Sequence, residues 1–296
     1  MTTAPPAAPA VPAPPALPDG SRRPRPPAGF RALLTVMATT PTGALRGRRL
    51  LGLAVLVGLP LIVQTLLLIF AEGRGSGFGS FAQFTVKAYL TVIIPLVAVF
   101  LGTAVLGDEW EGGTAHWVVG QPLSRGVIVA GRVLITAVRA LLLVLPALLL
   151  LYLLALAPHA GAVAHYLPAL GVVLGVVILM VLGYASIFVC LGVALRRSVM
   201  TSLVYVLVLD GFVSNLPSGF SALSLAFHAR NLLWNWTGEQ AFEPALMRAM
   251  EIVPTSSFES LLTVGIFMLF WTALATWALR RKEVGSGGPT VESSTT

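Results

Sequence analysis

The feature that most constrains this chain is a series of six long apolar runs. Each run is near the twenty residues that a helix needs to cross the hydrocarbon layer of a membrane. The runs cover about residues 50–70, 88–106, 133–157, 167–195, 198–216 and 258–279. Charged residues make up only 10% of the 296 residues, whereas a soluble domain carries about 25%. The sequence therefore predicts an all-α, polytopic membrane protein with six transmembrane helices, in contact with the lipid bilayer.

The two ends of the chain differ from this apolar middle. Residues 1–28 hold ten of the 21 prolines, and they predict a disordered tail because proline removes backbone donors. Residues 283–296 are rich in Gly, Ser and Thr and predict a second disordered tail. The transmembrane domain is expected over 29–282, beginning with an amphipathic helix in the membrane interface. The apolar residues of that helix that repeat at helical spacing are Phe30, Leu33, Leu34 and Met37.

The distribution of basic residues predicts the orientation. With a cytoplasmic N-terminus, fourteen of the nineteen Lys and Arg residues fall on the cytoplasmic side and four fall on the outer side. An excess of this kind marks the cytoplasmic side of membrane proteins. Both termini are therefore expected in the cytoplasm.

The same basic residues argue against a nucleic-acid partner. The net charge is +7, but the basic residues lie at the ends of apolar runs and not on one soluble module. Arginine outnumbers lysine seventeen to two, which together with abundant Ala, Gly and Pro indicates a GC-rich bacterial source. The expected location is the bacterial cytoplasmic membrane.

The most informative polar stretch is the link between the second and third runs, over 107–125. It reads Gly-Asp-Glu-Trp-Glu-Gly-Gly-Thr-Ala-His-Trp-Val-Val-Gly-Gln-Pro-Leu-Ser-Arg. Thr114 can cap a short helix that ends before Pro122, and Ser124 can cap the helix of the third span. The stretch between the two caps includes Trp117 and predicts a short helix that offers apolar residues for contact.

This link resembles that of the permease subunits of ABC-2 type ABC transporters. The residues that match the pattern of those subunits are Glu109, Glu111, Gly113, Thr114, Pro122, Ser124 and Arg125. The six runs and the long outer link near 217–257 are also similar, so that the resemblance covers about 30–282. His116 and Trp117 depart from the pattern, in which an acid and an aliphatic residue are more usual.

The resemblance implies a function and its partners. The segment 109–125, including Trp117, would be the coupling segment that docks on a separate ATP-binding subunit. A second permease subunit, identical or paired, would complete the membrane path, and export is the implied direction. The substrate cannot be read from the sequence.

No catalytic site is expected in this chain. A phosphate-binding P-loop needs a lysine after its glycines, followed by Ser or Thr, and neither Lys87 nor Lys282 has that context. ATP and magnesium are therefore expected on the partner subunit, with no cofactor here. The single cysteine, Cys190, can form no intramolecular disulfide, and no spacing of His, Cys and acidic residues is typical of a metal site.

Two ionisable residues fall well inside the predicted spans, away from their ends: Arg139 in the third and Asp210 in the fifth. Ionisable groups inside a membrane are costly and mark functional positions. The hypothesis is that the two pair, either stabilising the bundle or lining the transport path. The alternatives are that Arg139 extends to the inner headgroups and that Asp210 faces the outer mouth.

Two other classes of function stay open. A secondary transporter would show inverted repeats or broken helices with polar groups at mid-membrane, and no convincing repeat is present. A membrane-embedded enzyme would need converging polar side chains, and the spans offer little beyond Arg139, Asp210 and Gln64.

Overall fold

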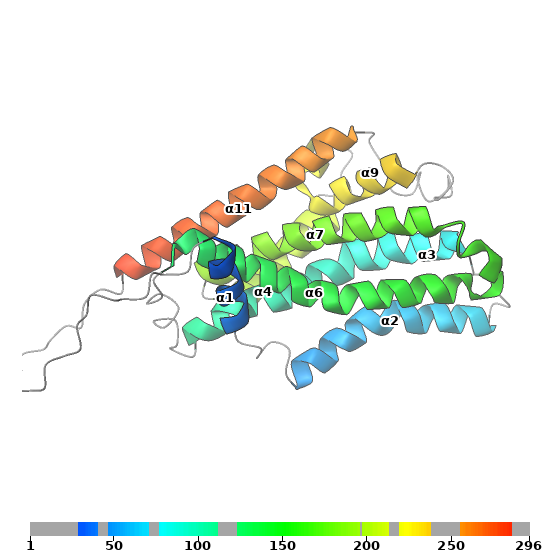
Figure 1. Ribbon diagram of the computed structural model, residues 1–296, viewed down its shortest axis with the longest axis horizontal. Helices are drawn as coiled ribbons and strands as arrows, with labels where there is room; N and C mark the ends of the chain where they lie inside the picture. The colour runs from blue at the N-terminus through cyan, green and yellow to red at the C-terminus, as the bar shows by residue number, and fades with distance from the viewer. Residues whose placement is uncertain are drawn as a thin grey trace, which may run out of the picture.

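The structure is a computed structural model that describes residues 29–40, 47–70, 77–111, 123–195, 197–212, 219–237 and 255–285. The regular elements in these ranges are all helices, and the long ones run lengthwise along an elongated bundle (Figure 1). The all-α, polytopic fold class is therefore confirmed. The principal helices are α1 (Phe30–Thr39), α2 (Arg48–Phe70), α3 (Phe78–Phe84), α4 (Ile94–Glu111), α6 (Arg125–Leu156), α7 (Leu167–Ala194), α8 (Ser198–Tyr205), α9 (Leu225–Thr237) and α11 (Ser257–Gly285).

Within the described ranges, five helical segments are long and apolar enough to cross a membrane. They are Arg48–Phe70, Phe78–Val105, Arg125–Ala162, Leu167–Ala194 and Ser257–Arg281. The second segment joins α3 to α4 through the π-helix η3 (Thr85–Ile93), so that it starts ten residues before the predicted run. Its helix also continues to Glu111, past the Gly107 at which the sequence indicated an end.

The predicted span 198–216 is the exception among the six. Its described part is a shorter helix, Ser198–Phe212, made of α8 and the π-helix η5 (Val206–Phe212). A second short helix, α9, follows after the one-turn helix η7 (Gly219–Leu223). The part of the predicted fifth span that the structure describes is helical throughout, and whether one helix runs over all of 198–216 stays a prediction.

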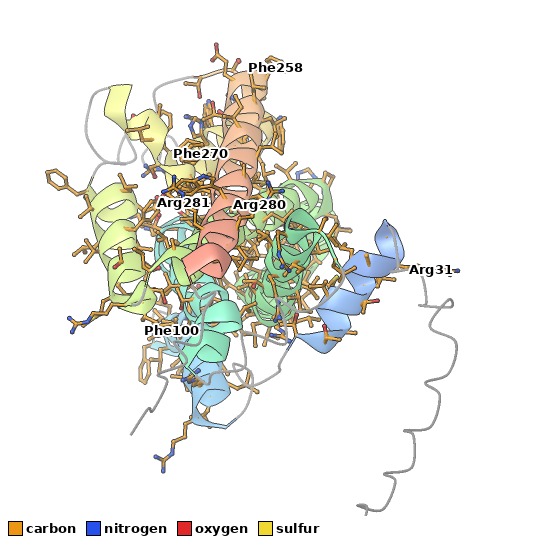
Figure 2. The ribbon with its side chains drawn as sticks, turned by 90° about the vertical axis from the view of Figure 1, so that its left-hand side faces the viewer. Arg31, Phe100, Phe258, Phe270, Arg280 and Arg281 are labelled. Atoms are coloured by element: carbon orange, nitrogen blue, oxygen red, sulfur yellow. The ribbon has the colours of Figure 1, made fainter. Side chains whose placement is uncertain are left out.

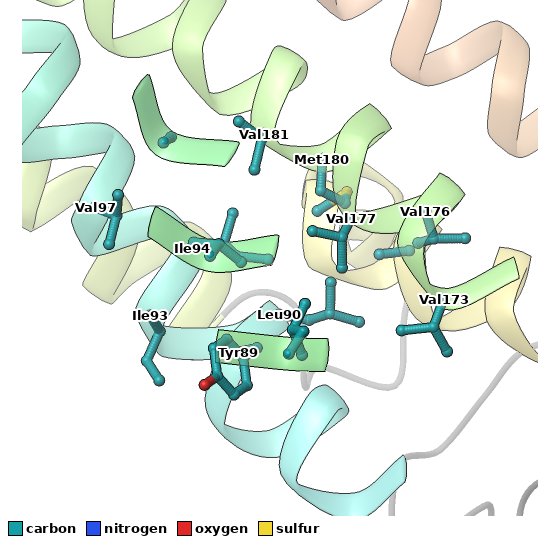
Figure 3. Close-up of a cluster of buried hydrophobic side chains, with 14 of the residues drawn as sticks. Tyr89, Leu90, Ile93, Ile94, Val97, Val173, Val176, Val177, Met180 and Val181 are labelled. Carbon is teal, nitrogen blue, oxygen red and sulfur yellow. The ribbon is translucent and has the colours of Figure 1, made fainter. Parts of the chain in front are cut away.

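Helix α7 is the centre of the bundle. It packs against α4, α6, α11 and α9, and its residues near Val177 and Met180 interdigitate with Leu90 and Ile94 of the facing helix (Figure 3). Two glycines bring α4 and α7 into close contact. A Cβ added at Gly192 would lie 3.1 Å from the Cα of Thr103 and 3.3 Å from the carbonyl oxygen of Gly102. Small residues at such a crossing allow the two backbones to approach.

Helix α2 lies at the edge of the bundle and exposes most of its apolar side chains. Two hydrogen bonds attach it to the neighbouring helix. The Tyr89 hydroxyl donates to the carbonyl oxygen of Val57 at 2.8 Å, and the Ser80 hydroxyl donates to Oε1 of Gln64 at 2.6 Å. The buried side chain of Gln64 therefore has a structural role, because it accepts a hydrogen bond that joins α2 to α3.

The predicted amphipathic helix is present as α1, and it lies across the end of the bundle at which α4 and α11 terminate (Figure 1). It packs against α6 through Ala32 and Val36. Phe30 and Leu34 point away from this contact, with exposed fractions of 72% and 46%. These two side chains are free to enter the lipid interface, as expected of an interfacial helix.

Candidate functional site

The sequence predicted a pair between Arg139 and Asp210, and the structure gives the two residues different partners. The Nη2 of Arg139 donates to the carbonyl oxygen of Thr40 at 3.0 Å, beside the C-terminus of α1. Carbonyl oxygens at a helix C-terminus lack partners inside the helix and attract a cation. Arg139 thus anchors the interfacial helix to α6, and its predicted pairing with Asp210 stays a prediction.

Asp210 is buried near the end of the described helix Ser198–Phe212. It lies in η5, only 1% exposed, and both carboxyl oxygens accept hydrogen bonds from other elements. The hydroxyl of Tyr184, in α7, donates to Oδ2 at 2.8 Å, and the hydroxyl of Ser224 donates to Oδ1 at 2.7 Å. The backbone N–H of Ala226, in the first turn of α9, is a third donor.

The basic neighbour of Asp210 is Arg230, one turn further along α9. The guanidinium attracts the carboxyl group electrostatically, and its residue is only 8% exposed. Burying a carboxylate is expensive unless hydrogen bonds and an opposite charge accompany it. The three donors and Arg230 provide both, so the cluster of Asp210, Tyr184, Ser224 and Arg230 joins η5, α7 and α9 at one point.

This cluster coincides with a change of helix. On one side α8 and η5 lead to Asp210, and on the other α9 begins at Leu225 and packs against α7 and α11. Leu225 lies over Gly183, next to Tyr184, where an added Cβ would come within 3.1 Å of the leucine side chain. Ionisable groups buried inside a membrane bundle mark functional positions in many transporters.

Sequence reasoning missed three members of this cluster. Arg230 and Ser224 fall in the expected outer link near 217–257, and Tyr184 falls in the apolar run 167–195. The sequence does contain a pattern that could have pointed to this helix. His228, Arg230 and Asn231 interrupt an otherwise apolar stretch from Leu225 to Leu233. Three polar residues in one apolar stretch of this length indicate a helix with a polar role.

The predicted coupling segment lies mostly outside the described residues. The backbone of Glu109 and Glu111 belongs to α4, and α6 begins at Arg125. Ser124 caps α6, since its hydroxyl oxygen accepts from the N–H of Val127 at 3.4 Å, which confirms the predicted cap. The positions that are not described are Gly113, Thr114, Trp117 and Pro122.

The described ranges contain no group of three His, Cys, Asp or Glu side chains that could hold a metal ion. The polar groups around Asp210 are its carboxyl, two hydroxyls that donate hydrogen bonds to it, and a guanidinium that interacts with it electrostatically. This arrangement is that of a polytopic helical membrane protein with a charged cluster inside its bundle. It contains no described nucleophile paired with a base.

Comparison with known proteins assigns the family. The family described as ABC-2 family transporter protein matches residues 42–284, which is most of the chain. The chain therefore belongs to the ABC-2 family of transporter proteins, and it is a membrane permease component of an ABC transporter. This class implies a separate ATP-binding partner and a lipid environment. A search of curated proteins found no match.

Proposed function

We propose that this chain forms one half of an export path through the bacterial cytoplasmic membrane, driven by a separate ATP-binding subunit. The observation that carries the proposal is the family match over 42–284, together with five helices able to cross a membrane. A second copy or a paired permease supplies the other half of the path. ATP and magnesium bind to the partner subunit, and no cofactor binds to this chain.

The docking site for that subunit is the segment 109–125. Helix α4 ends and α6 begins at the same end of the bundle, which is also the end at which α1 lies (Figure 1). Figure 2 views the molecule from this end and shows Arg280 and Arg281 near the end of α11, with Arg31 on α1. Basic residues gathered at one end favour a cytoplasmic orientation for it.

The first experiment tests docking. The tagged chain is co-expressed with the ATP-binding subunit encoded beside it and purified in detergent. The wild-type chain is expected to retain the subunit, and the double variant Glu111→Ala with Arg125→Ala is expected to lose it together with transport-linked ATPase activity. Arg31→Ala is the control, because Arg31 is exposed and lies at the same end outside the segment. Unchanged co-purification of the double variant would contradict the proposed docking site.

The second experiment tests the orientation. We propose that both termini are cytoplasmic, as the fourteen-to-four distribution of basic residues predicts. An alkaline phosphatase fused after Thr296 is then expected to be inactive, and a fluorescent protein at the same position is expected to fold. An active phosphatase would show the opposite topology.

Asp210 is our candidate residue for the transport path, with Arg230 as its charged partner. An ionisable pair inside the membrane that joins η5 and α9 to the central helix is suited to a moving element of a transporter. Arg139 has a different role in this proposal, since it attaches α1 to α6 at the cytoplasmic end.

A further inference from the structure

Helix α9 is unusual because its first nine residues are all buried although three of them are polar. These residues run from Leu225 to Leu233. His228 is 4% exposed and Asn231 is 1% exposed. Buried polar side chains are almost always hydrogen-bonded, and each exception needs an explanation. The polar atoms of α9 are therefore a place to look for a ligand.

The hydrogen bond of His228 fixes the state of its ring. Its Nε2 lies 2.8 Å from the carbonyl oxygen of Ala222, which can only accept a hydrogen bond. In the neutral ring Nε2 therefore carries the proton, and Nδ1 is left as an acceptor. This Nδ1 is buried and has no hydrogen-bond partner.

Asn231 offers the complementary group. Its Nδ2 is a donor, and it too is buried without a hydrogen-bond partner. Residues three apart on a helix face the same side, so His228 and Asn231 place an acceptor and a donor one turn apart. A single small group that both donates and accepts, such as a hydroxyl or an amide, would satisfy both atoms. A bare anion or cation would satisfy only one of them.

The position of this pair connects it with the transport path. The N-terminal turn of α9 bonds to Asp210 through Ser224 and Ala226. At the other end, the Asn235 side chain donates to the carbonyl oxygen of Thr255 before α11. His228 and Asn231 thus flank Arg230 of the charged cluster, on the helix that leads toward the connection with α11.

We propose that His228 and Asn231 form a binding subsite for a hydroxyl or amide group of the transported molecule. The group donates its hydrogen to Nδ1 of His228 and accepts one from Nδ2 of Asn231. The inference rests on the proposed function, because it takes the interior of this bundle as part of the path. It also narrows the substrate class to molecules that carry such a group on an apolar body.

The test uses the full-length chain in lipid nanodiscs, labelled with ¹⁵N-histidine and studied by NMR. The probes are benzyl alcohol and toluene, which share a ring and differ in the hydroxyl group. The spectrum of His228→Gln identifies the signal of His228. We expect benzyl alcohol to shift the Nδ1 signal in a saturable way and toluene to leave it in place. Asn231→Leu is expected to weaken the alcohol's apparent affinity about fivefold, the effect of one neutral hydrogen bond.

Two results would overturn the subsite. One is an equal response to both probes. The other is an Nδ1 signal that couples to water protons and ignores the alcohol, which would make the pair a hydration site. The wild-type titration decides the matter even if Asn231→Leu does not fold. Co-purification of the wild-type chain with its ATP-binding subunit does not depend on the probes. If the wild-type chain retains that subunit but does not bind benzyl alcohol, the subsite is refuted and the proposed function is not.

Discussion

The hydroxyl of Tyr184 provides the sharpest test of the charged cluster. Tyr184→Phe removes one donor to Oδ2 of Asp210 and nothing else, because phenylalanine keeps the ring. That ring is stacked on Phe188, with centroids 5.9 Å apart and planes 4° apart. The variant therefore retains the packing of α7 and leaves one carboxyl oxygen of Asp210 without this hydrogen bond.

Two ranges bracket the expected loss of stability. A hydrogen bond to a charged group contributes about 1.5–3 kcal/mol in soluble proteins. Side-chain hydrogen bonds between helices in a membrane average about 0.6 kcal/mol and reach about 1.7 kcal/mol. Tyr184 and Asp210 are both fully buried and the bond is 2.8 Å long. We therefore expect the top of the membrane range, about 1.5 kcal/mol, which is roughly tenfold in the unfolding equilibrium.

The measurement is reversible unfolding by SDS in mixed micelles, followed by fluorescence of the six tryptophans. Tyr152→Phe is the matched control, because its hydroxyl donates to the neutral carbonyl of Val163, and we expect a loss near 0.6 kcal/mol. A double-mutant cycle with Asp210→Leu, which leaves no side-chain acceptor, should recover a coupling near the full effect of Tyr184→Phe. A loss no larger than that of the control, or no coupling with Asp210, would refute the reasoning.

Two further predictions concern the helix contacts. Gly192→Ala should destabilise the protein by about 1–3 kcal/mol in the same unfolding assay, because the new Cβ meets backbone atoms of α4. Gly175→Ala on the same helix is the control, since its Cβ meets nothing within 4 Å. Equal losses of stability in the two variants would contradict the close crossing of α4 and α7. Arg139→Leu removes the donor to the carbonyl of Thr40, so hydrogen exchange of the α1 backbone should accelerate about tenfold or more, from a loss of about 1.5–3 kcal/mol. Arg31→Leu, at an exposed position of α1, is the control and should leave exchange unchanged.

The helices around Asp210 show where sequence reasoning stopped. The run 198–216 is apolar enough to predict a span, and its first part is a helix. Its partner α9 has a lower apolar content, because His228, Arg230 and Asn231 lie in it. Hydropathy therefore assigned those residues to an outer link, although the helix is buried among α7, α11 and η5. Burial by neighbouring helices is a tertiary property that no local pattern contains.

The choice of partner for Asp210 has the same origin. The sequence suggested Arg139 as the partner because both residues are ionisable and fall inside predicted spans. In the structure α8 packs on α4 and α7, and the carboxyl group meets Arg230 of α9. Which face of a helix meets which neighbour depends on side-chain packing, and the spacing of residues along one helix does not determine it.

The sequence by itself determined that this chain is a helical membrane protein, where most of its helices lie, and to which transporter family it is similar. These properties follow from local composition, since about twenty apolar residues form a helix in a membrane whatever surrounds them. The tertiary structure alone decided that Asp210 joins three helical elements, that Arg139 holds the interfacial helix, and that α9 carries unpartnered polar atoms. Those properties depend on which helices touch, and residues far apart in the chain meet only when the bundle packs.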